Sequence, residues 1–299
     1  MQNAKLKNYL HLHLLVFIAG FTAILGELIT LSAVPLVWFR MVMASILMFA
    51  YIKVKGIKLR INKRFLLRYA LAGVLIALHW ITFFAAIDAA NVSIALAMFS
   101  TGAFFASIIE PMVFKRKVIG YEIIFGVFVI LGIYIISQSE LKYISGMLLG
   151  VVSAFLSSSF AVLNGVFLKQ NTPTLISFYE FLSGILFITL YILLFGNGFS
   201  KEFFILPFND YVYLVVLASV CTAYAFIAAI HVMKLISPYT VVLTYNLEPI
   251  YGIVIALLLF PENEKMSPNF YYGAFLIIVT VLANGLLKNR QAIKTWRSK

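Results

Sequence analysis

Ionisable residues within long apolar stretches are the first places in this sequence where chemistry could occur. Glu248 lies in the apolar stretch 238–260 and is followed by Pro249. At about 1.5 Å per helical residue, its carboxyl lies ~15 Å from the start of that stretch, near the middle of a bilayer. A carboxyl at that depth can exchange a proton or neutralise a cationic substrate, and the proline can free backbone carbonyls to line a cavity. The alternative is a neutral acid that is hydrogen-bonded between two helices.

Three further charged residues, Arg40, Glu27 and Glu180, also fall within apolar stretches. An arginine keeps its proton and needs a partner when buried, and Glu27 is the partner that we expect near the same membrane face. The pair would form a gate or contact an anionic substrate, or it would be a static ion pair that locks two helices. Glu180 would lie near the opposite face, at the headgroup level or beside Lys169 or Lys234.

Aromatic and amide side chains are expected at a depth similar to that of Glu248. Together they would form an aromatic, weakly polar substrate pocket, and they are His79, Trp80, Tyr224, Tyr245 and Asn246. A single membrane histidine can instead bridge two helices. The four histidines are scattered along the chain, and there is one cysteine, Cys221. This pattern offers no spacing typical of a metal site or of a catalytic nucleophile with its base, so we predict no metal, no cofactor and no catalytic residue.

Membrane-spanning helices must position these residues. The sequence is 63% apolar and 11% charged, far from the composition of soluble domains. A helix needs about 20 apolar residues to cross a bilayer, and this requirement predicts an all-α integral membrane protein with ten spans. The spans lie near 10–31, 34–53, 68–88, 92–114, 120–138, 144–168, 174–195, 211–233, 238–260 and 268–287.

The basic residues predict the orientation of these spans. Of the 23 Lys and Arg, 19 fall on segments that share a side with the N-terminus, whereas Lys142, Lys201 and Lys265 fall on the opposite side and Arg40 lies within a span. Lys and Arg concentrate on the cytoplasmic side of membrane proteins. We therefore expect a multi-pass protein of the inner membrane with both termini in the cytoplasm. The net charge of +12 then reflects topology and not binding to nucleic acid.

Two internal similarities predict a duplication. Residues 87–114 align with 233–260 at an offset of 146, and the four residues from Trp38 align with the four from Phe178 at an offset of 140. A nearly constant offset is typical of a repeated unit. The chain then divides into two five-helix repeats, residues 1–140 and 141–299, and because five is odd the second repeat is inverted in the membrane.

The two Glu-Pro pairs of the sequence do not correspond in this alignment. Glu110 and Glu248 both precede a proline, but they are 138 residues apart. The offset of 146 instead places Glu248 opposite Gly102 and Glu110 opposite Ala256. The acid at mid-membrane is therefore expected in one repeat only.

Several short motifs resemble those of EamA-type members of the drug/metabolite transporter superfamily. They are His79-Trp80-Ile81-Thr82-Phe83-Phe84-Ala85-Ala86-Ile87 followed by Val92-Ser93 and Ala95-Leu96, Arg40 in the second span, and Asn246-Leu247-Glu248-Pro249 followed by Pro261-Glu262. The resemblance extends over nearly the whole chain. It implies ten helices, two pseudo-symmetric halves around a central cavity, and transport of small metabolites, often outward.

These features together predict a secondary transporter that exports small organic metabolites, such as amino acids, across the cytoplasmic membrane by alternating access. Inverted repeats recur in such carriers because two similar halves can open a central site to either side. The sequence has no ATP-binding loop of the G-x-x-x-x-G-K type, so a gradient would supply any energy. Its partners would be membrane lipid, the solute and, as one option, protons, but no nucleic acid; monomer and dimer both stay open. The alternatives are a membrane-embedded lipid-modifying enzyme and a passive solute channel.

Overall fold

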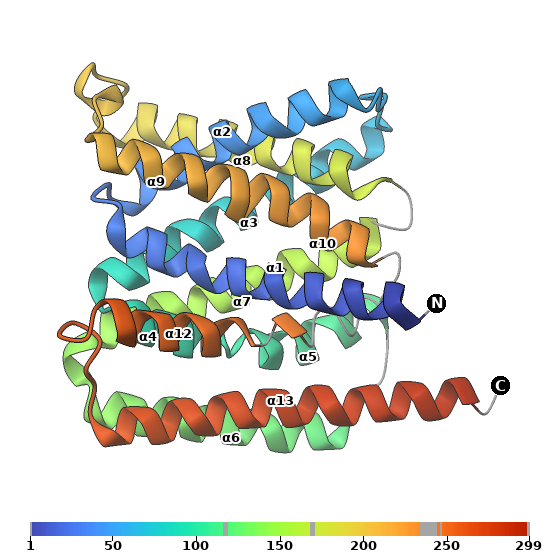
Figure 1. The fold of residues 1–299 in the computed structure, drawn as a ribbon, viewed down its shortest axis with the longest axis vertical. Coiled ribbons are helices and arrows are strands. Elements are labelled where there is room, and N and C mark those ends of the chain that lie inside the picture. The colour runs from blue at the N-terminus through green and yellow to red at the C-terminus, as the bar shows by residue number, and fades with distance from the viewer. Residues whose placement is uncertain (1, 116–118, 168–170, 234–243, 246, 298–299) are drawn as a thin grey trace.

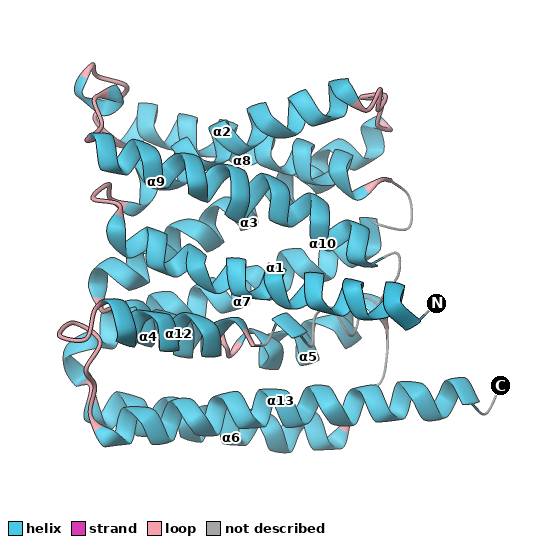
Figure 2. Cartoon of the chain, viewed as in Figure 1, coloured by secondary structure: helices cyan, strands magenta, loops and turns pink. Residues whose placement is uncertain are grey.

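The protein is a bundle of helices. The computed structural model describes residues 2–115, 119–167, 171–233, 244–245 and 247–297, and all of the regular structure in these residues is helical. The helices run side by side across the molecule (Figure 1, Figure 2). The all-α membrane fold expected from the composition is therefore confirmed.

The first half of the chain contributes five spans. Their helices are α1 (Gln2–Leu28), α2 (Ala33–Val54), α3 (Lys63–Ala89), α4 (Val92–Phe99) with α5 (Gly102–Phe114), and α6 (Gly120–Ser139). The fourth span is divided because Ser100 Oγ donates to the Ala97 carbonyl at 2.6 Å and Thr101 Oγ1 to the Met98 carbonyl at 2.7 Å. Such local bonds from Ser and Thr compete with helical backbone bonds, and a turn between α4 and α5 results.

The second half is more irregular. Its helices are α7 (Ile144–Phe167), α8 (Pro173–Phe195), α9 (Phe208–Ala218), α10 (Ala225–Met233), α12 (Glu248–Leu259) and α13 (Pro268–Arg297), with the short helices η1 (Leu141–Tyr143) and η2 (Glu202–Phe204) in loops. A π-helix, η3 (Ser219–Tyr224), joins α9 to α10. Within the described residues, nine spans are long and apolar enough to cross a membrane and α12 is a shorter apolar helix. The first part of the predicted ninth span, 238–243, lies outside the described residues.

The two halves are inverted repeats of one another. The helix after the break in the fourth span begins at Gly102, and α12 begins at Glu248. These two starts are separated by the offset of 146 that the sequence shows. Figure 1 shows both termini at the same end of the bundle, as an even number of crossings requires.

The core of the bundle lies at the seam between the halves. α3 packs against α7 and α8, α1 against α12, and α4 against both α7 and α12. Figure 1 shows α6 and α13 paired along one side of the bundle. A Cβ atom added at Gly132 would lie 3.0 Å from the Gly273 carbonyl oxygen, and one at Gly273 would lie 2.7 Å from the Gly132 carbonyl oxygen. These two glycines thus let the backbones of α6 and α13 approach closely, as small residues do between membrane helices.

A buried carboxylate holds α4 at the end of the bundle opposite the termini, which we call the distal end. Glu264, in the loop between α12 and α13, is fully buried. Its two oxygens accept hydrogen bonds from the backbone nitrogens of Val92 at 2.9 Å and Ser93 at 2.8 Å. Both nitrogens are in the first turn of α4, where no intrahelical acceptor exists. Glu264 therefore satisfies this helix start and ties the second half to the first.

Two more carboxylates make comparable bonds at the distal end. Asp210 in α9 is 1% exposed and accepts from Thr30 N at 3.1 Å and from Thr30 Oγ1 at 2.6 Å. Glu140, just after α6, accepts from the backbone nitrogen of Ser267 at 2.9 Å. Each bond joins residues of different halves, and charge-assisted bonds of this kind are stronger than neutral ones.

Candidate functional site

Arg40 is a buried cation at the seam, and its hydrogen bonding is incomplete. It lies in α2 and is 2% exposed. Its Nε donates to Thr222 Oγ1 at 2.8 Å, and its guanidinium carbon lies 4.0 Å from the centroid of the Trp80 ring and 5.7 Å from that of Phe84. The Nη1 atom is buried and has no hydrogen-bond partner in the part of the chain that the structure describes. The contacts with Thr222 and Trp80 thus fix the guanidinium in place, and its Nη1 atom stays available for a further hydrogen bond.

The π-helix η3 brings Thr222 to Arg40. Thr222 Oγ1 donates to the Leu217 carbonyl at 2.8 Å, so its hydroxyl can accept the Arg40 hydrogen bond at the same time. A π turn inserts one extra residue into a helix and often occurs at a functional site. Cys221, the residue before Thr222, is also buried, and its side chain is close enough to interact electrostatically with Arg40.

Glu248 supplies the opposite charge from the second half. It is the first residue of α12 and follows Leu247, which lies in a turn. Its charge acts on Arg40 and that of Arg40 on it, but no ion pair joins these two described residues. The two groups are close enough to interact and are not directly bonded.

The position of Glu248 depends on a close crossing of α1 and α12. A Cβ atom added at Gly20 would lie 3.1 Å from both the Glu248 carbonyl oxygen and the Gly252 backbone nitrogen. A larger residue at Gly20 would push the start of α12 away from α1. The backbone contact therefore helps to set where the carboxyl of Glu248 lies at the seam.

His79 and Trp80 are adjacent in α3 but make different contacts. His79 Nδ1 lies 2.8 Å from Ser153 Oγ and 3.1 Å from the Ser153 carbonyl, and Ser153 Oγ donates to the His79 carbonyl at 3.1 Å. This geometry is the helix-bridging alternative, here between α3 and α7. Trp80 faces Arg40 and packs edge-on against Phe181, with ring centroids 5.4 Å apart. Of the two residues, Trp80 is the one whose ring packs against the charged group of Arg40 at the seam.

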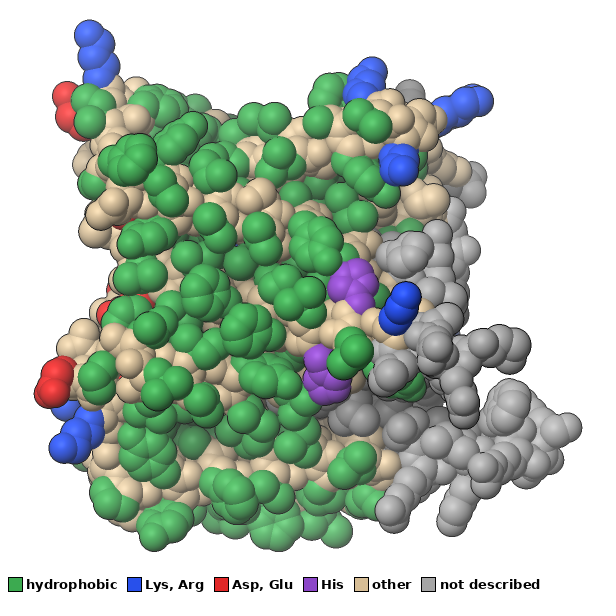
Figure 3. Space-filling view, viewed as in Figure 1, with side chains coloured by type: hydrophobic (Ala, Val, Ile, Leu, Met, Phe, Trp, Pro, Cys, Tyr) green, Lys and Arg blue, Asp and Glu red, His purple; other side chains and the backbone are tan. Residues whose placement is uncertain are grey.

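Of the other predicted pocket residues, Tyr224 and Tyr245 have their own contacts in the described structure. Tyr224 is 43% exposed, and its hydroxyl lies 2.8 Å from His11 Nε2; the expectation that it shares a pocket with His79 is therefore wrong. Figure 3 shows histidine side chains at this surface of the molecule. Tyr245 packs against an apolar cluster formed by α1 and α10. Asn246 lies outside the described residues.

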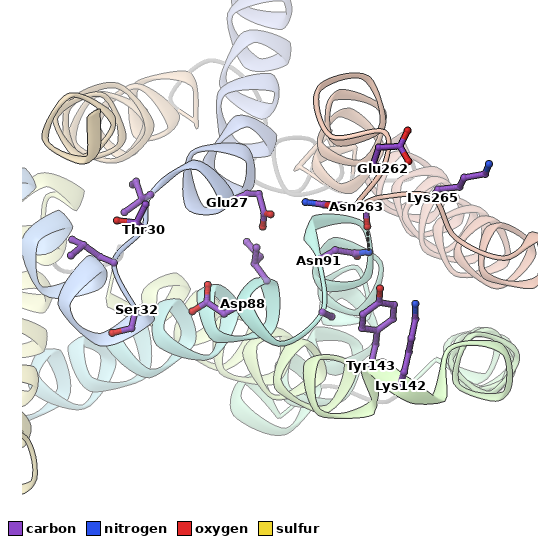
Figure 4. A pocket seen from close by; sticks show the side chains of 14 residues that line it. Glu27, Thr30, Ser32, Asp88, Asn91, Lys142, Tyr143, Glu262, Asn263 and Lys265 are labelled. Atoms are coloured by element: carbon purple, nitrogen blue, oxygen red, sulfur yellow. Dashed lines mark hydrogen bonds between the residues drawn. The ribbon is translucent and has the colours of Figure 1, made fainter. Parts of the chain in front are cut away.

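Glu27 is not the partner of Arg40. It lines a cavity of about 680 Å³ at the distal end, and its electrostatic neighbours are Glu264 and Asp88. Figure 4 shows Glu27 and Asp88 on one side of this cavity and Lys142 on the other. The expected ion pair between Glu27 and Arg40 is therefore wrong, because Arg40 instead contacts Thr222 and Trp80.

Glu180 is buried inside the bundle, and its depth relative to the headgroups stays a prediction. It is 0% exposed, and its Oε2 accepts from Asn164 Nδ2 at 3.3 Å. Its Oε1 atom is buried and has no hydrogen-bond partner among the residues that the structure describes. The suggested partners Lys169 and Lys234 lie outside the described residues.

Sequence reasoning missed Thr222 and Asn164, which bond the two embedded charges. Neither residue belongs to a motif, and each is a neutral polar residue within an apolar span. The π turn at Thr222 has no signal in the hydropathy pattern. A search for polar residues at the depth of Arg40 and Glu180 would have found both, among many others.

The fold and the seam together define a class of protein. Two inverted five-helix halves, with interrupted spans and opposite charges where they meet, are the architecture of a polytopic membrane transporter. The sequence model of the EamA-like transporter family matches residues 6–138 and again residues 144–286. The chain therefore belongs to the EamA-like transporter family, within the drug/metabolite transporter superfamily.

Known structures support the fold. One solved structure, described as "Crystal structure of protein", aligns with a TM-score of 0.65 at 13% sequence identity and covers 95% of this chain and 98% of its own. At that identity the likeness concerns the fold alone. A comparison with curated proteins gave no match.

Proposed function

We propose that this transporter is a secondary carrier that exports small organic metabolites, such as amino acids, by alternating access. The observation that carries this proposal is the meeting of Arg40 from one half with Glu248 from the other at the seam, without a direct ion pair. Charged groups buried at mid-membrane are costly and mark substrate or ion sites. In the proposed cycle, Glu248 takes up a proton or the cationic group of the solute.

The interrupted spans support this cycle. The break between α4 and α5 and the π-helix η3 both lie in spans that pack around the seam. Non-helical backbone at membrane depth is tolerated where it is enclosed by protein or lines a cavity. Carriers place their sites at such breaks because the two parts of a span can then move separately.

Solute exchange in proteoliposomes tests the proposal. A carrier loaded with unlabelled solute will accelerate the uptake of the same labelled solute at low outside concentration, whereas a channel will show no such counterflow. Amino acids and small organic acids and amines make up the panel. Absence of counterflow together with passive leakage of the same solutes would show a channel.

The role of Glu248 has its own test. We expect Glu248→Gln to abolish accumulation driven by a pH gradient and to leave exchange intact, since exchange needs no net proton movement. Glu202→Gln, at an exposed residue of the loop helix η2, is the matched control. Unchanged accumulation by Glu248→Gln would contradict proton coupling at this residue.

The orientation is also proposed, with both termini in the cytoplasm. Figure 1 shows the two termini at one end of the bundle, and the basic residues of the sequence favour that end as cytoplasmic. In a Cys221→Ser background, a cysteine at Lys142 should react with a membrane-impermeant maleimide added to whole cells, whereas one at Lys7 should not. The reverse pattern would refute the orientation.

A further inference from the structure

Arg40 is unusual for a buried cation, because its Nη1 atom donates to none of the described residues. A guanidinium has five N–H donors and cannot shed its proton, and a buried charge that lacks partners is costly. Yet Nη1 has no hydrogen-bond partner among the described residues, and the side chains of Thr222, Trp80 and Phe84 that Arg40 contacts are all neutral. The cost suggests that another group completes the hydrogen bonding of Arg40 when the carrier works.

The surroundings hold the guanidinium in one orientation. Thr222 fixes the Nε end at 2.8 Å, and the Trp80 ring covers one face at 4.0 Å. Trp80 is itself held between Phe181 and Phe226, with ring centroids 5.4 Å and 6.1 Å away. A planar guanidinium held in this way, with Nη1 unpartnered among the described residues, is suited to a carboxylate, which can accept a charge-assisted hydrogen bond from it.

The nearby Glu248 restricts the charge of the ligand. A phosphate dianion would bring two negative charges to one arginine with an acid close by, whereas a carboxylate brings one. The charge arrangement therefore favours a monoanionic group at Arg40.

We propose that Arg40 binds the carboxylate group of the transported solute and so selects for it. This inference rests on the proposed carrier function and adds a requirement to it: the solute has a carboxylate. Trp80 and Thr222 act as positioning residues for the guanidinium.

The first test uses the unaltered protein, so it does not depend on the folding of a variant. Counterflow is measured for a panel of amino acids, for their carboxamides, which keep the amine and lack the carboxylate, and for small monocarboxylic acids. We expect each carboxamide to need a concentration at least tenfold higher than its amino acid for half-maximal exchange, because a charge-assisted hydrogen bond is lost. Equal exchange of the two, or exchange of no carboxylate-bearing solute, would overturn the assignment.

The second test places the requirement on Arg40. Arg40→Gln should raise the half-saturating concentration of the amino acid at least tenfold and leave that of the carboxamide unchanged, since the two changes remove the same contact. Arg40→Lys, which keeps the charge without the planar fork, should give an intermediate loss. A merely structural arginine would weaken exchange of both solutes alike, and that result would refute the proposal.

The two proposals can fail separately. If the protein exchanges amines and not carboxylates, the carrier function stands and the assignment of Arg40 falls. If no solute shows counterflow, the carrier function itself falls. The melting temperature of each purified variant, measured beside the wild type, separates a loss of binding from a loss of folding.

Discussion

Two buried carboxylates at the distal end of the bundle use both of their oxygens in hydrogen bonds. Two buried charges nearer its centre use only part of their hydrogen-bonding capacity within the described residues. Glu264 uses both oxygens on the first turn of α4, and Asp210 uses both on Thr30. By contrast, Arg40 and Glu180 are just as buried, but each keeps one polar atom that has no partner within the described ranges. The comparison separates charges that hold the two halves together from charges that stay available.

The physical reason lies in what each carboxylate or guanidinium meets. Backbone nitrogens at a helix start have no intrahelical acceptor, so an acid placed there satisfies itself and the helix together. In mid-span the backbone is already bonded, and an embedded charge must find a side chain or a ligand. We therefore expect the distal acids to matter for stability and the seam charges to matter for transport.

The largest effect on stability is expected for Glu264→Ala. The change leaves the backbone nitrogens of Val92 and Ser93 buried without an acceptor, and we expect a loss of about 3–5 kcal/mol in the free energy of unfolding. Unfolding in mixed detergent micelles measures it. Glu262→Ala, an exposed acid in the same loop, is the control and should leave stability unchanged. A loss below about 1 kcal/mol would mean that water replaces the carboxylate.

Asp210→Asn should have a smaller effect of the same kind. An asparagine of similar size can still accept one hydrogen bond from Thr30, but the charge that strengthens both bonds is lost, so we expect a cost of about 1–2 kcal/mol. The same unfolding measurement applies, with the exposed Asp88→Asn as its control. Equal stability of the two variants would remove Asp210 from the group of structural acids.

Arg40→Met should sharpen the comparison in the opposite direction. Replacing a buried and incompletely bonded charge by an apolar side chain of similar length is often neutral or stabilising, so we expect a change within about 1 kcal/mol. Exchange of carboxylate-bearing solutes should nevertheless be lost. If the variant unfolds as readily as Glu264→Ala, Arg40 belongs with the structural charges and the distinction fails.

The smallest effect is expected for Glu180→Gln. The amide oxygen can still accept the hydrogen bond from Asn164, and removing the charge relieves burial, so the free energy of unfolding should change by less than about 1 kcal/mol. Comparison of this variant with Asn164→Ala in the same assay tests the assignment. A large loss for Glu180→Gln alone would show that the negative charge is needed for the fold.

Much of the fold was determined by the sequence alone. Hydropathy is a local property, so the sequence predicts where the spans lie. The offset of 146 between Gly102 and Glu248 predicts the inverted repeat, and helices begin at both residues. The candidate charges were found for the same reason: an ionisable residue within an apolar span is visible without a partner. The sequence likewise predicted that only one half carries the acid at this position.

Only the tertiary structure decided which side chains meet. Sequence gives the depth of a residue in a span but not the direction in which it faces, and this direction depends on every irregularity in the helix. One extra residue in η3 turns the side chains after it by about 100°, which is why Thr222 meets Arg40 while Tyr224 lies at the surface. The bonds of Glu264 come from a loop, which has no periodicity to predict them. Contacts between residues more than 170 positions apart exist only once the two halves have packed together.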